Sequence, residues 1–212
     1  MKFYVKAQDP ISFFTHFIGA VLAIIGTLFI VIQQINTYAS TLTIISVLIF
    51  GLSMFTLYSA SSIYHYVSDL SPYKTHLRKF DHASIYVLIA GTYTPICLAY
   101  MDNGLQFCIG IWAVAILGII IKLCWLNAPR FLSTIFYLAL GWSIVLDLSV
   151  FNEMSKVCFS YIAIGGISYS IGAIIYMIKK PNFSKQFGFH ELFHIFVMLG
   201  TFFHFLAIAF YI

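Results

Sequence analysis

The residues best suited to chemistry in this sequence are the two histidines of HELFH, His190 and His194, at the start of the last apolar segment. On a helix, residues four apart lie about 40° apart around the axis and about 6 Å apart along it. Both imidazoles can therefore reach one metal ion. Catalytic zinc takes three protein ligands and keeps one position open for water, so a third ligand must come from another part of the chain.

The composition indicates the class of protein in which this third ligand must be found. Of the 212 residues, 61% are hydrophobic and only 8% are charged, too few charges for a soluble domain of this size. The net charge of +4 does not indicate a nucleic-acid partner, because the Lys and Arg residues are scattered between apolar runs. The four cysteines show no C-x-x-C spacing, so they predict neither a disulfide framework nor a cysteine-based zinc site. We therefore expect an integral membrane protein.

Seven apolar runs are each long enough to cross a hydrocarbon core of about 30 Å as a helix. They cover residues 11–33, 41–64, 82–100, 105–126, 131–151, 157–178 and 189–212. The sequence thus predicts an all-α integral membrane protein, with residues 1–212 forming a single seven-transmembrane helix bundle.

The positive charges in the connections predict its orientation. With a cytoplasmic N-terminus, only Lys156 lies outside, and the C-terminus is outside as well. The cytoplasmic set is Lys2, Lys6, Lys74, Arg78, Lys79, Lys122, Arg130, Lys179, Lys180 and Lys185.

This topology brings polar residues from distant segments to one level of the bilayer. His65 at the exit of the second span, Asp81 at the entrance of the third, and His190 with His194 all fall near the cytoplasmic face. Ionisable groups in a membrane are costly and rarely face lipid. Ser61 lies one turn before His65, on the same helical stripe. We predict that His65 is the third metal ligand and that Asp81 is a separate carboxylate of the site.

Two further residues leave alternatives open. HELFH also satisfies H-E-x-x-H, in which Glu191 is the general base of a metalloprotease, here an intramembrane one. Its position weakens this hypothesis, because Glu191 lies about 100° around the helix from His190. His16 in the first span is at cytoplasmic depth and could line the same cavity, although membrane base rates favour a buried hydrogen bond for it.

Three motifs resemble the hemolysin III family, which belongs with the progestin and adipoQ receptors and, more distantly, with the alkaline ceramidases. They are SSIYH at 61–65, FDHASIYVLIAGTYTP at 80–95 and HELFHIFVMLGTFFHF at 190–205. The resemblance implies a multi-pass protein of the plasma membrane, the inner membrane of a bacterium, that binds zinc near its cytoplasmic side. It maps S-x-x-x-H to Ser61 and His65, the acidic position to Asp81, and H-x-x-x-H to His190 and His194.

These assignments predict a reaction. Zinc held by three imidazoles lowers the pKa of its water to about 7; Asp81 would accept the proton and Ser61 would orient a substrate oxygen. We expect hydrolysis of a membrane lipid amide or ester. One alternative is a receptor-like sensor of membrane state in which zinc is structural. Another is the membrane-lysing toxin of the family name, which the lack of an amphipathic insertion segment disfavours.

Overall fold

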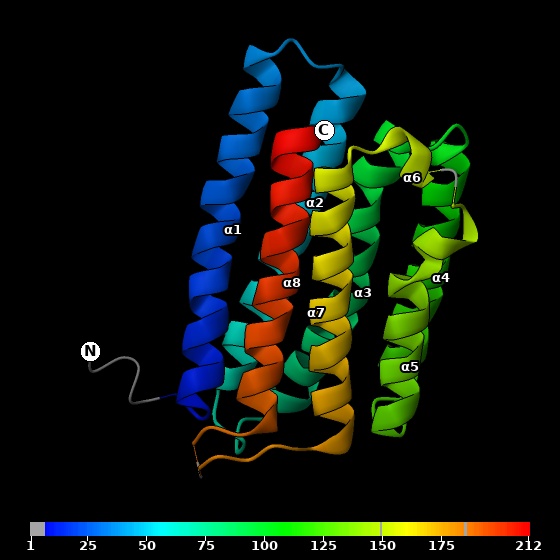
Figure 1. The fold of residues 1–212 in the computed structure, drawn as a ribbon. Coiled ribbons are helices and arrows are strands. Elements are labelled where there is room, and N and C mark those ends of the chain that lie inside the picture. The colour runs from blue at the N-terminus through cyan, green and yellow to red at the C-terminus, as the bar shows by residue number, and fades with distance from the viewer. Residues whose placement is uncertain (1–6, 149, 185) are drawn as a thin grey trace.

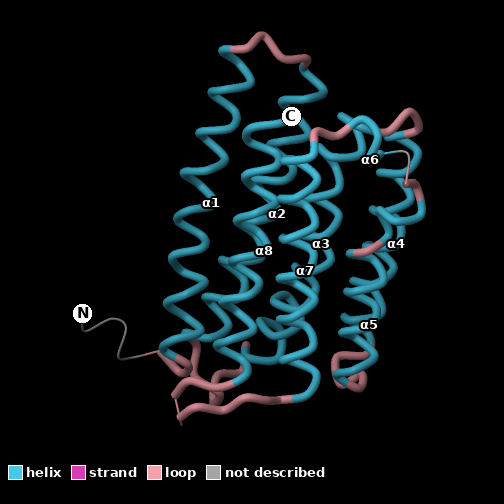
Figure 2. The backbone as a smooth tube through the Cα atoms, viewed as in Figure 1, coloured by secondary structure: helices cyan, strands magenta, loops and turns pink. Residues whose placement is uncertain are grey.

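The structure is a computed structural model that describes residues 7–148, 150–184 and 186–212. These residues form helices joined by turns, and no strand occurs among them (Figures 1 and 2). The all-helical class is therefore confirmed. Lys2, Lys6 and Lys185, three of the cations behind the predicted orientation, lie outside the described residues.

Six helices of the described chain are long and apolar enough to cross a membrane. They are α1 (Pro10–Asn36), α2 (Thr41–Tyr66), α3 (Lys74–Tyr100), α4 (Gly104–Cys124), α7 (Lys156–Ile178) and α8 (Phe189–Tyr211). Ser40 caps α2 by accepting from the Thr43 N–H, and Ser155 caps α7 by accepting from the Cys158 N–H. Large aliphatic side chains such as Ile25 point outward, as a lipid-facing surface requires.

The helices pack mainly against their neighbours in sequence. α1 packs on α2, α2 on α3, α3 on α4 and α7 on α8, while α8 also packs against α1. Figure 1 shows α8 between α1 and α7, so the last helix lies beside the first. This arrangement brings the start of α1, the end of α2 and the start of α8 together at one end of the bundle.

The third helix begins eight residues earlier than predicted, at Lys74 instead of residue 82. The predicted start was the first residue of the apolar run, but the Lys and Arg residues before it are good helix formers. The Lys74 ammonium also donates to the carbonyls of Tyr64 and Val67, at 2.8 and 2.7 Å, where α2 ends. Asp81 therefore lies within α3 and not at its entrance.

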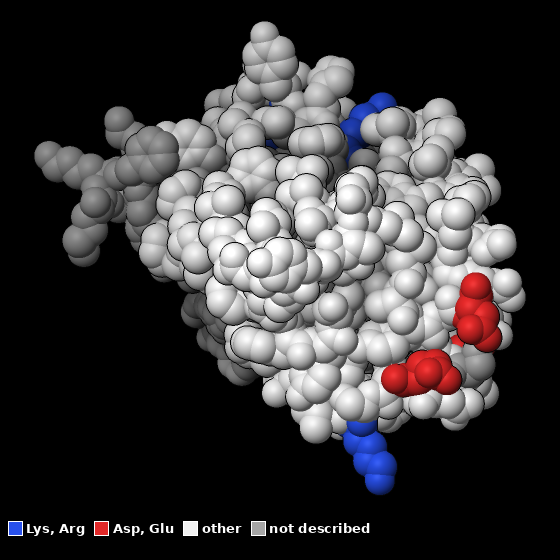
Figure 3. Space-filling view, turned by 90° about the horizontal axis from the view of Figure 1, so that it is seen from above, with Lys and Arg blue, Asp and Glu red and all other residues white. Residues whose placement is uncertain are grey.

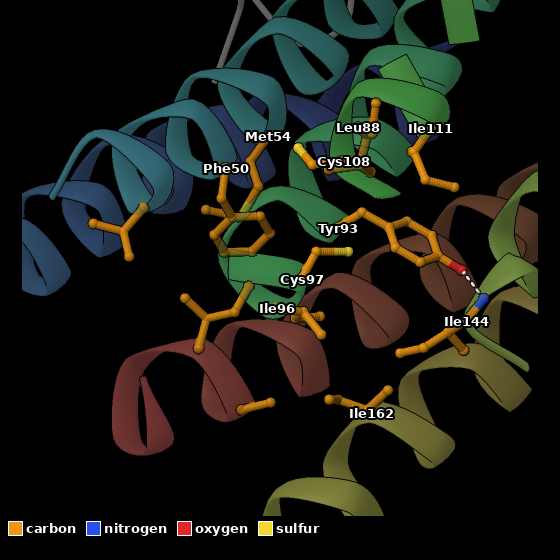
Figure 4. Close-up of a cluster of buried hydrophobic side chains, with 14 of the residues drawn as sticks. Phe50, Met54, Leu88, Tyr93, Ile96, Cys97, Cys108, Ile111, Ile144 and Ile162 are labelled. Carbon is orange, nitrogen blue, oxygen red and sulfur yellow. Dashed lines mark hydrogen bonds between the residues drawn. The ribbon is translucent and has the colours of Figure 1, made fainter. Parts of the chain in front are cut away.

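The fifth predicted span is broken. Instead of one helix over 131–151, the chain forms α5 (Arg130–Gly141), the 3-10 turn η2 (Ser143–Leu146) and the short α6 (Val150–Glu153). The 12 residues of α5 are about 18 Å long, less than a hydrocarbon core. Tyr93 satisfies backbone groups at the break, because its hydroxyl donates to the Gly141 carbonyl and accepts from the Ile144 N–H, each at 2.8 Å (Figure 4).

The apolar core is built around α3. Leu88, Ile96 and Cys97 of α3 are each at most 3% exposed, and they pack with buried side chains of α2, α4, η2 and α7 (Figure 4). All four cysteines are free; three are buried, as a packing role predicts, whereas Cys124 is exposed. Since α3 also carries Asp81, the core that holds the bundle together fixes that carboxylate.

Candidate metal centre

The three predicted metal ligands lie together at the end of the bundle where α2 ends and α8 begins. One ring nitrogen each of His65, His190 and His194 lies within 4.8 Å of the others. His65 Nε2 is 3.2 Å from His190 Nε2. Nitrogens of a tetrahedral zinc site lie about 3.3 Å apart when each metal bond is about 2.0 Å. This set of three imidazoles therefore fits a zinc ion.

Asp9, immediately before α1, orients one of these imidazoles. Its carboxylate lies 2.9 Å from His65 Nδ1, which assigns the ring proton to Nδ1 and leaves the Nε2 lone pair facing the other histidines. The same hydrogen bond holds the pKa of the Asp9 carboxyl below its usual value. Asp9 is not among the site residues predicted from the sequence. Its position at the start of the first span, at the end of the bundle where the site lies, was the available signal.

His16 of α1 lies against the cluster. Its ring stacks on that of His194 with centroids 3.7 Å apart and planes 7° apart, and the edge of Tyr58 packs on it at 5.1 Å. His16 also lines the same cavity as His194. The structure thus supports the alternative in which His16 belongs to the site.

Ser61 and Asp81 are both buried near the histidine cluster. Ser61 is 1% exposed and Asp81 is 8% exposed, and their side chains interact across the contact between α2 and α3. Both line one cavity together with His190 and His194, whereas His65 is not among its lining residues. The structure therefore brings four of the five predicted site residues to one cavity, and it places His65 beside two of them in the histidine cluster.

The cavity is long and largely apolar. Its lining on α3 extends from Arg78 to Tyr93, a distance of about 22 Å along the helix. Its apolar walls come from α2, α3, α5 and α8 and include Leu57, Ile85, Leu88, Ile89, Leu138 and Val197. A chamber of this kind between helices is suited to an apolar chain with its polar end at the histidines.

Glu191 has a different role from the general base of H-E-x-x-H. One carboxylate oxygen accepts from the Gly188 N–H at 2.9 Å, and the other accepts from the Ser12 hydroxyl at 3.0 Å. Glu191 therefore caps α8 and ties it to α1. Both of its oxygens are engaged in these contacts, which argues against the metalloprotease alternative.

The fold and the histidine cluster define a multi-pass integral membrane protein, and comparisons with known proteins identify its family. The Haemolysin-III related family matches residues 4–205. Hemolysin-3 homolog of Bacillus subtilis (strain 168) is 37% identical over 200 residues, covering 93% of this chain and 91% of its own length. Hemolysin-3 of Bacillus cereus is 33% identical over 215 residues, with coverages of 100% and 94%.

A more distant relative is human Monocyte to macrophage differentiation factor, which is 26% identical over 171 residues, or 76% of this chain and 67% of the relative. The chain belongs to the haemolysin-III-related family, and the resemblance read from its three motifs is confirmed. Membership together with the six apolar helices makes it a multi-pass membrane protein of bacterial type.

Proposed function

We propose that this protein is a zinc-dependent hydrolase of a lipid amide or ester. The observation that carries the proposal is that the histidine cluster and two other polar groups of distinct chemistry meet at one apolar cavity. The carboxylate of Asp81 and the hydroxyl of Ser61 line it beside His190 and His194. A purely structural metal has no need of such a chamber.

The residues divide the reaction among them. His65, His190 and His194 would hold the zinc ion, which when bound would activate a water molecule as a nucleophile near neutral pH. Asp81 accepts a proton from the attacking water and delivers it to the leaving nitrogen or oxygen, as the new carbon–oxygen bond forms and the amide or ester bond breaks. Ser61, beside Asp81, donates a hydrogen bond to the substrate or orients the carboxylate.

The proposal includes seven membrane crossings with a cytoplasmic N-terminus. In Figure 1, α5 lies toward one end of the bundle and α6 near the other, which supports counting α5, η2 and α6 together as a fifth, irregular crossing. Irregular backbone at membrane depth is tolerated where protein satisfies it, as Tyr93 does here. Figure 3 views the end that carries the α1–α2 turn, where few charged side chains are visible, in keeping with an outer face.

The test compares single substitutions in detergent-purified protein. Asp81→Asn should keep one zinc per chain yet lower fatty-acid release from N-acyl and ester lipids by about 10²–10⁴-fold, because only the proton acceptor is removed. His65→Ala should lose the zinc, as measured by mass spectrometry. Asp102→Asn is the matched control, since Asp102 is exposed and is not a cavity residue.

The alternative is a zinc ion with a purely structural role. The burial of His65 and His194, each 2% exposed, is the observation that favours it. In that case the wild type binds zinc without hydrolysing any lipid of the panel, and His65→Ala lowers only the unfolding temperature. The lytic activity in the name of the Bacillus cereus relative is tested by liposome leakage. Leakage at low protein-to-lipid ratio without hydrolysis would overturn the proposal.

A further inference from the structure

The cavity carries a group of cations that the proposed reaction does not use. Arg78 of α3, Lys122 at the end of α4 and Arg130 at the start of α5 all line it. Lys122 and Arg78 are close enough to repel each other, and both, together with Arg130, act electrostatically on His82. Three positive side chains from three helices therefore line the cavity near His82.

These cations outnumber the acidic groups around them. None of the three forms an ion pair with another described residue. Among the described residues that line the cavity, Asp81 is the one acidic side chain, and it attracts Arg78 without forming an ion pair with it. Lys122 is 5% exposed, and its ammonium donates to the neutral hydroxyl of Ser133 at 3.1 Å. Burying a charged ammonium without a counter-charge is costly. The cavity is therefore electrostatically complementary to an anion.

Setting membrane orientation does not by itself account for this arrangement. A cation that serves only as a topology signal needs to reach water or lipid headgroups, as the exposed Lys179 and Lys180 can. Lys122 is instead enclosed within the protein. Arg130 is also held in place, because its guanidinium lies over the ring of Tyr176 at 4.5 Å and over that of Phe189 at 5.4 Å.

The cation group lies next to the histidine cluster. Tyr176, on which Arg130 stacks, has its ring centroid 5.8 Å from that of His190. One aromatic ring thus separates the guanidinium from a predicted metal ligand. A ligand held by the cations would have its neighbouring bonds close to Asp81 and the histidines, while the apolar walls along α3 would hold its chain.

We propose that the cavity binds a lipid with an anionic polar end, held by Lys122, Arg130 and Arg78, with its acyl chain along α3. A phosphate or a carboxylate would satisfy the same donors. The inference rests on the proposed hydrolase only for the position of the scissile bond. Binding itself needs neither zinc nor turnover.

The experiment measures binding of dodecyl phosphate and dodecyl phosphocholine to the protein in dodecyl maltoside, by calorimetry. The two probes share one chain and differ in net charge. We expect dodecyl phosphate to bind at least about tenfold more tightly, and the Lys122→Gln/Arg130→Gln double variant to lose about tenfold or more of that affinity. The charge-keeping Lys122→Arg/Arg130→Lys variant should retain the preference, and it still tests the site if the glutamine variant does not fold.

The matched control is Lys156→Gln/Lys180→Gln, which removes two exposed cations outside the cavity. An equal loss of affinity in this control, or equal binding of both probes by the wild type, would overturn the proposal. Inorganic phosphate binding as tightly as dodecyl phosphate would overturn its lipid part. The Asp81→Asn protein should bind dodecyl phosphate at least as tightly as the wild type, because the substitution removes a negative charge from the cavity. Failed hydrolysis and failed recognition are thus distinguished.

Discussion

At the scale of single residues, the contact between Asp9 and His65 determines which nitrogen is available to a metal. Imidazole has two ring nitrogens, and the hydrogen bond made by one selects the other as ligand. Asp9 lies 2.9 Å from Nδ1, and its backbone N–H also donates to the His65 carbonyl at 3.0 Å. The residue before α1 is therefore a positioning residue for the end of α2.

Asp9→Asn should weaken zinc binding by about 10–100-fold. The neutral amide would hold the His65 imidazole less firmly than the carboxylate does, and it would place no negative charge beside the ring. Chelator competition on the purified protein measures this dissociation constant. Gln8→Ala is the control, since it removes only the neighbouring hydrogen bond to Asp69. If both variants weakened zinc equally, docking of the N-terminal segment, and not the carboxylate, would be responsible.

At the scale of helices, the site depends on close contact between α2, which carries Ser61 and His65, and α3, which carries Asp81. Gly91 allows this approach. A Cβ at that position would lie 2.3 Å from the Ser53 hydroxyl oxygen and 3.3 Å from the Ile49 carbonyl oxygen. Ser53 is itself buried and donates to the Phe50 carbonyl, so it has little room to move.

Gly91→Val should therefore destabilise the bundle by about 1–3 kcal/mol through overpacking, measured as a lower unfolding temperature in detergent. Gly110→Val on α4 provides the comparison, because a Cβ there meets no atom within 4 Å while the change in helix propensity is the same. Equal destabilisation by the two substitutions would assign the effect to propensity and not to the contact between α2 and α3.

At the scale of the whole molecule, the irregular fifth segment decides the number of crossings. Asn127 precedes α5 and Lys156 begins α7, so these two exposed positions bracket the segment. If α5, η2 and α6 cross the membrane together, the two positions lie on opposite sides. If they do not, both lie on the same side and the seven-crossing proposal is wrong.

Single cysteines at these positions, in a Cys124→Ser background, test this with a membrane-impermeant thiol reagent on intact cells. Lys156→Cys should be labelled directly, and Asn127→Cys only after permeabilisation. Lys180→Cys, in the connection before α8, should behave like Asn127→Cys. The remaining cysteines are buried and should give little background, which the Cys124→Ser protein alone verifies.

The sequence by itself determined the class of fold and the candidate metal ligands of the site. Hydropathy is a local property, so the long apolar runs identify α1, α2, α4, α7 and α8 almost to their ends. The spacing of four residues places His190 and His194 on one face of a helix. The even number of predicted spans between the segments places His65 and Asp81 at the same depth in the bilayer as these two histidines. Counting crossings needs no knowledge of side-chain contacts, so this juxtaposition could be predicted.

Only the tertiary structure decided what supports those ligands. Asp9 meets His65 across 56 residues and Ser12 meets Glu191 across 179, and neither contact leaves a periodic pattern in the sequence. The break after Gly141 depends on a hydroxyl from α3, and the early start of α3 on a lysine that reaches the end of α2. Local hydrophobicity determines which segments become helices, whereas hydrogen bonds between distant segments determine where helices end and which polar groups face the cavity.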